Sequence, residues 1–85
     1  MPEVEIGRVS DFFARPVVAG VELTAPLKVG ETIKIVGHTT SLTFTVESMQ
    51  INNANVSQAR PGDKIGIKVP DRVRRGDRVL KVEPD

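Results

Sequence analysis

The 85-residue sequence contains no cysteine, no tryptophan and no tyrosine, and it has a single histidine. Without cysteine, the chain has neither disulfides nor thiolate metal sites to stabilise it. His38 has no cysteine and no second histidine with which to share a metal ion. We therefore expect no metal and no cofactor, and we expect His38 to be an exposed loop residue.

Long apolar runs are also missing, since no stretch approaches the roughly 20 residues that cross a bilayer. The first five residues are acidic and do not resemble a secretory signal. These absences predict a protein without membrane contact, and together with the lack of cysteine they favour a cytoplasmic location.

Sequence motifs of nucleotide binding and catalysis are absent as well. The sequence has no GxxxxGK[ST] loop for phosphates and no GxGxxG segment that opens a helix. Its serines lie in no nucleophile-elbow motif, and a catalytic triad would have to use His38. We therefore expect that the chain is not an enzyme.

One short pattern occurs three times: glycine, an acidic residue, any residue, then isoleucine or valine. The copies are Gly30-Glu31-Thr32-Ile33, Gly62-Asp63-Lys64-Ile65 and Gly76-Asp77-Arg78-Val79. Glycine supplies a backbone conformation that other residues resist, and aspartate can hydrogen-bond the backbone of a turn. Each copy therefore predicts a turn that leads into a strand.

Alternating apolar residues between these turns predict strands, and no segment has the apolar period of a helix. Gly7 marks an expected bulge in the first strand, Pro16 is expected to restrict pairing after it, and a change of parity at Glu47-Ser48 predicts a second bulge. The six expected strands cover residues 4–15, 17–23, 32–36, 42–51, 64–69 and 78–82, and the sequence leaves open a further short strand at 56–59. We predict one all-β domain over residues 1–85, a small closed or nearly closed six-stranded antiparallel β-barrel.

The charge is unevenly distributed along the chain, although the net charge is only +1. Residues 1–59 carry a net charge of −2, and residues 60–85 carry +3. This bias predicts either a surface that faces a polyanion or a solvated surface of mixed charges. If it is a binding surface, its residues are Arg60, Lys64, Lys68, Arg72, Arg74, Arg75 and Arg78.

The order of these elements resembles the second, β-barrel domain of translational GTPases such as elongation factor Tu. Residues 27–37 carry the strongest local match, and the segments 6–9, 17–23, 43–50, 59–67 and 73–80 follow the same order. The resemblance implies a stand-alone, elongation factor-like barrel without a GTPase domain, which binds RNA or a ribosome- or tRNA-related particle. The family has an asparagine near the position of Lys64, so an aminoacyl pocket is not carried over.

A second interpretation is a protein-interaction or accessory module for a separately encoded enzyme. The C-terminal barrel of collagenase-like peptidases looks similar too, which makes such a peptidase the example to consider. RNA and a protein are therefore the two alternative partners at this point.

Overall fold

The structure is a computed structural model that describes residues 3–15 and 17–83. Pro16, which was expected to restrict pairing, lies outside these residues. The described residues form strands, turns and loops, and they contain no helix. The strands are β1 (Glu3–Ala14), β2 (Val17–Leu23), β3 (Leu27–Lys28), β4 (Thr32–Val36), β5 (Ser41–Thr45), β6 (Met49–Ile51), β7 (Ala54–Val56), β8 (Gln58–Ala59), β9 (Lys64–Lys68) and β10 (Arg78–Val82).

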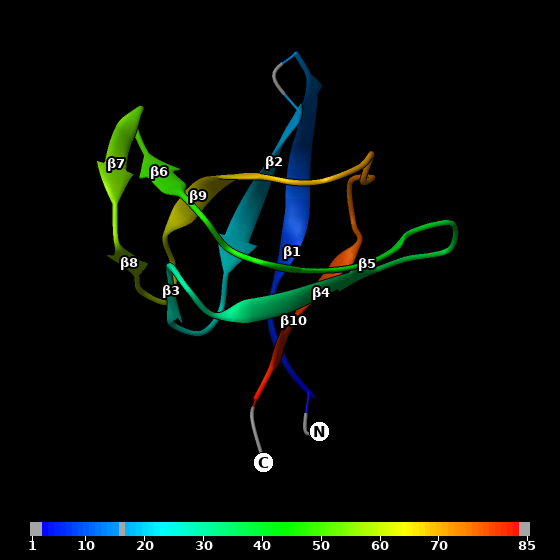
Figure 1. The fold of residues 1–85 in the computed structure, drawn as a ribbon, viewed down its shortest axis with the longest axis horizontal. Coiled ribbons are helices and arrows are strands. Elements are labelled where there is room, and N and C mark those ends of the chain that lie inside the picture. Colours follow the sequence, from blue (N-terminus) through cyan, green and yellow to red (C-terminus); the bar gives the residue numbers. More distant parts are fainter. Residues whose placement is uncertain (1–2, 16, 84–85) are drawn as a thin grey trace.

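Eight strands form one antiparallel sheet in the order β5-β4-β10-β1-β2-β9-β6-β7, and β3 pairs with β8 in a separate two-stranded sheet. Figure 1 shows β4 and β5 running across the direction of β1 and β2, so the sheet is strongly coiled. The all-β, antiparallel prediction is confirmed. For the predicted closed or nearly closed six-stranded barrel, closure is wrong, because among the described residues no ladder joins β5 to β7. The described sheet has eight strands rather than six.

Strand β1 lies at the centre of the sheet, and its pairing with β10 brings the first and the last described strands side by side. It pairs with β10 on one side, where Glu3 is opposite Val82, and with β2 on the other. The predicted bulge at Gly7 is confirmed by a register shift between Glu5 and Gly7. A second shift, between Val9 and Asp11, was not predicted.

The region expected to be one bent strand, 42–51, is two strands with different partners. β5 pairs with β4, whereas β6 pairs with β9 and with β7. The parity change at Glu47-Ser48 therefore marks a break between strands rather than a bulge. The turn between β6 and β7 has Asn52 and Asn53 with φ of 52° and 65°, the left-handed conformation that a two-residue hairpin needs.

The three glycine-acidic turns share one geometry. Each glycine has a positive φ, between 88° and 97°, at the third position of a turn. Each carboxylate accepts a hydrogen bond from the backbone N–H three residues earlier, and the three pairs are Lys28–Glu31 at 2.7 Å, Arg60–Asp63 at 2.9 Å and Arg74–Asp77 at 2.9 Å. Glycine and side chain together therefore fix the turn, as the sequence predicts.

Each turn also binds the backbone of a residue distant in sequence. The glycine N–H donates to the carbonyl of the distant residue at 2.8 Å. The N–H of the distant residue in turn donates to the carbonyl of the acidic residue of the turn at 2.9 Å. The pairs are Gly30 with Val46, Gly62 with Leu23 and Gly76 with Val9. The turns therefore tie the coiled sheet together at three places.

The core consists mainly of aliphatic side chains and draws on most of the strands. In β4 and β9 the alternation is regular: Ile33, Ile35, Ile65 and Ile67 are buried. Burying such side chains is the main stabilising contribution to folding. The same alternation places Lys64 and Lys68 on the outer face of β9.

A candidate interaction surface around Asp11

Asp11 lies on the outer face of the sheet at the unpredicted shift in β1. Its neighbour across the ladder is Gly20 on β2. A β-carbon added at Gly20 would lie 3.2 Å from the β-carbon of Asp11, closer than such atoms normally approach. The missing side chain at Gly20 therefore leaves the space that the Asp11 carboxylate occupies.

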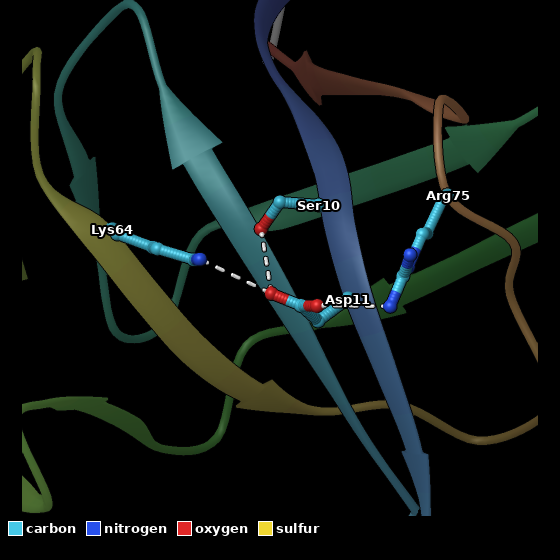
Figure 2. Close-up of polar contacts among 4 residues, drawn as sticks. All are labelled: Ser10, Asp11, Lys64 and Arg75. Carbon is cyan, nitrogen blue, oxygen red and sulfur yellow. Dashed lines mark hydrogen bonds and ion pairs between the residues drawn. The ribbon is translucent and has the colours of Figure 1, made fainter.

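Two cations reach the Asp11 carboxylate from opposite sides, as Figure 2 shows. Lys64 extends across β2 from β9, with Nζ 3.1 Å from Oδ2, and Arg75 extends from the third turn, with Nη2 3.5 Å from Oδ1. The Ser10 hydroxyl donates to Oδ2 at 3.4 Å. The hydrogen bond from Lys64, with the charges of Lys64 and Arg75, lowers the pKa of Asp11.

A second ion pair connects β10 to β1. Nε of Arg78 donates to Oε1 of Glu5 at 2.6 Å. This hydrogen bond and the Arg78 charge lower the pKa of Glu5, and Arg8 adds to the effect. Arg78 is therefore engaged in holding two neighbouring strands, with its side chain still half exposed.

Acid is expected to destabilise the protein through Asp11 and Glu5. Their pKa values are lower in the folded state than in the unfolded state, so the ionised forms stabilise the fold above the unfolded pKa. That contribution is lost as the pH falls through the folded pKa. Urea unfolding, followed by circular dichroism from neutral pH to about pH 2, measures the decline.

The Glu5→Gln/Asp11→Asn double variant provides the control for this prediction. It is expected to lose stability less steeply with acid than the parent protein, and the difference is expected to shrink at high salt because exposed pairs are screened. Equal slopes for the two proteins would contradict the assignment.

The seven cationic residues predicted as a binding surface are all exposed, but they do not line one common hollow. Lys64 lines a groove beside Asp11, Lys68 lines a second hollow next to Phe44 and Glu47, and Arg72 and Arg74 line a third. Arg72 also lies 6.0 Å from the centre of the Phe12 ring. Of the others, Arg75 joins Lys64 through Asp11, Arg78 binds Glu5, and Arg60 begins the second turn.

Residues that the sequence did not single out complete the groove beside Asp11. Phe13 is 58% exposed, whereas its neighbour Phe12 packs partly against the core. Arg15 and the amides of the β6–β7 hairpin also line this groove, and only the pairing of the strands brings them there.

Among residues 3–15 and 17–83, no three histidine, cysteine, aspartate or glutamate side chains are grouped so as to hold a metal ion. The same residues include no helix that is long and apolar enough to span a membrane.

The fold matches that of a small all-β domain known from a peptidase. The crystal structure of the C-terminal domain of a Geobacillus thermoleovorans protein, assigned to the U32 peptidases, superposes with a TM-score of 0.87 at 17% identity. The match covers 94% of this chain and 93% of that domain. The selenomethionine variant of that domain gives 0.84 at 17% identity, covering 88% of this chain and 95% of that chain. The class of fold is therefore that of a U32 peptidase C-terminal domain.

In sequence, the chain is similar to an uncharacterized protease of Methanocaldococcus jannaschii. The two are 46% identical over 78 residues, which is 91% of this chain and 19% of the protease. The chain therefore spans about a fifth of the length of the curated relative it matches. No protein-family model matches the chain.

These relatives correct the resemblance to the second domain of translational GTPases, which is wrong. The sequence match is to a protease, and the structural matches are to a peptidase C-terminal domain. The expected translation and elongation factor-like roles are wrong for the same reason. Glycine-acidic turns in the right order thus indicated a type of β-structure and not a family.

Proposed function

We propose that this protein is a non-catalytic accessory module of a collagenase-like peptidase. The observation that carries the proposal is the 46% identity to a protease, confined to about a fifth of that protease's length. A segment of this size is typical of one domain in a longer chain. The likeness to a peptidase's C-terminal domain supports the same role.

The distribution of reactive side chains also supports a non-catalytic role. His38 lies exposed in the loop between β4 and β5. The carboxylates with lowered pKa values, Glu5 and Asp11, are each held by a cation. A carboxylate fixed in its ionised form by such partners is suited to hold structure rather than to donate a proton near neutral pH. A cytoplasmic location, without membrane contact, stays a prediction.

Exchanging the matched segment in the Methanocaldococcus protease tests the proposal. Three proteins are compared: the intact protease, the protease without the matched 78 residues, and a chimera that carries this chain in their place. We expect the deletion to reduce hydrolysis of gelatin and the chimera to restore it, because the two modules share their fold. Short peptides should be cleaved similarly by all three proteins, because the catalytic part is unchanged.

Binding in trans provides a second readout. Sedimentation velocity of this chain mixed with the deleted protease is expected to give a complex that survives nuclease treatment. If the deletion hydrolyses gelatin like the intact protease and forms no complex with this chain, the accessory role is wrong.

A further inference from the structure

A groove of about 630 Å³ opens on the outer face of β1, β2, β9 and β6. This volume lies in the range of sites that bind small molecules or short segments of chain. Its lining combines an exposed aromatic ring, charged side chains of both signs and three side-chain amides. Such a mixture differs from the aliphatic core on the other face of the same strands.

Two glycines form the floor of the groove. Gly20 on β2 is directly opposite Gly66 on β9, and Gly66 is in turn opposite Gln50 on β6. Because β2 and β9 each have a neighbour on both sides, the floor is a continuous, already paired sheet. A ligand there would rest on the backbone at Gly66, beside the Asp11–Lys64 ion pair that covers Gly20. It would contact the side chains of the walls without adding a strand.

The two walls are hairpins. On one side, Phe13 and Val18 stand opposite each other in the β1–β2 ladder, and both line the groove. On the other side, the β6–β7 hairpin presents Asn52 and Asn53, and Gln50 is held by a 3.1 Å hydrogen bond to Asn55. An apolar wall therefore faces a wall of amides, which can donate to and accept from peptide groups.

Positive charge predominates around the groove. Asp11 is the only carboxylate in the lining that the structure describes, and Lys64 and Arg75 both bind it. Arg15 in the lining adds a further cation. Figure 2 shows how the Asp11 carboxylate lies between its two cations, so that its own charge is offset on both sides. Because one carboxylate is set against Lys64, Arg75 and Arg15, the net charge around the groove is positive and complements an acidic ligand.

We propose that this groove binds an extended, acidic segment of polypeptide, as the site at which the module holds a substrate chain. An aliphatic or aromatic side chain of the segment packs against Phe13, its carboxylates lie near Arg15 and Lys64, and its peptide groups contact Asn52 and Asn53. This inference rests on the proposed function, because the substrate of a peptidase is a polypeptide.

Fluorescence anisotropy with three labelled octapeptides tests the proposal. In the first, glutamate and leucine alternate; in the others, glutamine or lysine replaces glutamate. We expect the purified protein to bind the glutamate peptide, the glutamine peptide at least about tenfold more weakly and the lysine peptide not at all. In nitrogen–proton NMR spectra, the backbone amides of Gly20, Gly66, Asn52 and Asn53 should shift on binding.

Variants with matched controls locate the site. Phe13→Ala and Arg15→Glu are each expected to weaken binding of the glutamate peptide about tenfold. Val29→Ala and Lys28→Glu make the same kinds of change at exposed positions in the first turn, away from the groove, and should bind like the parent. Gly66→Val fills the floor and should abolish binding, with its folding checked by circular dichroism.

Three results would overturn the proposal: equal binding of the three peptides, equal affinity of the groove and control variants, or tighter binding of an oligouridylate of eight nucleotides than of any peptide. These outcomes are separable from failure of the proposed function. A chimeric protease carrying Phe13→Ala and Arg15→Glu that still hydrolyses gelatin fully would reject the groove and leave the accessory role intact.

Discussion

Replacing Gly7 with alanine is expected to lower the free energy of unfolding by about 3 kcal/mol. A β-carbon at this position would overlap the backbone carbonyl oxygen of Glu22 and come within 3.2 Å of the α-carbon of Leu23. Both atoms belong to the backbone of the paired strand, so no side chain can rotate away. Since β1 is paired on both sides, the displacement would disturb its ladders with β2 and β10.

Gly66→Ala is the matched control for this variant. There the added β-carbon would lie 3.6 Å from Cγ1 of Val18, an ordinary contact, so we expect a change within about 0.5 kcal/mol of the parent. Because the chain has no tryptophan or tyrosine, urea unfolding is followed by far-ultraviolet circular dichroism. Similar stabilities of the two variants would show that β1 and β2 can separate at Gly7 at little cost.

The second large effect is expected for Asp77→Ala, which should lower the free energy of unfolding by about 2 kcal/mol. Asp77 is 6% exposed, and its carboxylate accepts from the Arg74 N–H at 2.9 Å. It also packs so closely against Gly37 that a β-carbon there would overlap it. Alanine would leave a donor without its acceptor and a gap between the third turn and the end of β4.

The same change in the first turn, Glu31→Ala, provides the comparison. Glu31 makes the equivalent hydrogen bond at 2.7 Å but is more exposed, so water can replace its carboxylate and the loss should be below about 1 kcal/mol. Asp77→Asn, which keeps an acceptor oxygen, should fall between the two. Urea unfolding measures all three variants, and equal losses for Asp77→Ala and Glu31→Ala would contradict the role assigned to burial.

Local features of the fold could be predicted well from the sequence. Alternating apolar residues predicted the strands β4 and β9, and the glycine-acidic pattern predicted the three turns. Strands and turns are both determined within a few residues. A strand follows from the two-residue period of its side chains, and each of these turns follows from a glycine with positive φ and a carboxylate that hydrogen-bonds the turn backbone. For the same reason such turns occur in unrelated β-proteins, which explains why they suggested the wrong family.

Which strands lie side by side could not be predicted in this way. At Glu47-Ser48 the apolar residues change from one strand face to the other, which in the sequence looks like a bulge. Only the different pairing partners of β5 and β6 show that the chain breaks into two strands there. The groove depends on the same long-range pairing, since Asp11, Lys64 and Arg75 meet through the order β1-β2-β9 and the third turn. Gly20 and Gly66 are likewise adjacent only across a ladder.

The three turn contacts have a consequence for the order in which the chain folds. They join residues that are 16, 39 and 67 positions apart, as Gly30–Val46, Leu23–Gly62 and Val9–Gly76. Closing the longest of these loops costs only about 1 kcal/mol more than closing the shortest, but distant contacts slow folding. During synthesis, β1 and β2 can form a hairpin early, while the other edge of β1 waits for β10, which lies about 70 residues further along the chain. Until then the central strand, which carries the core residues Ile6 and Val9, has one open edge. The chain is most exposed to aggregation at this nascent stage.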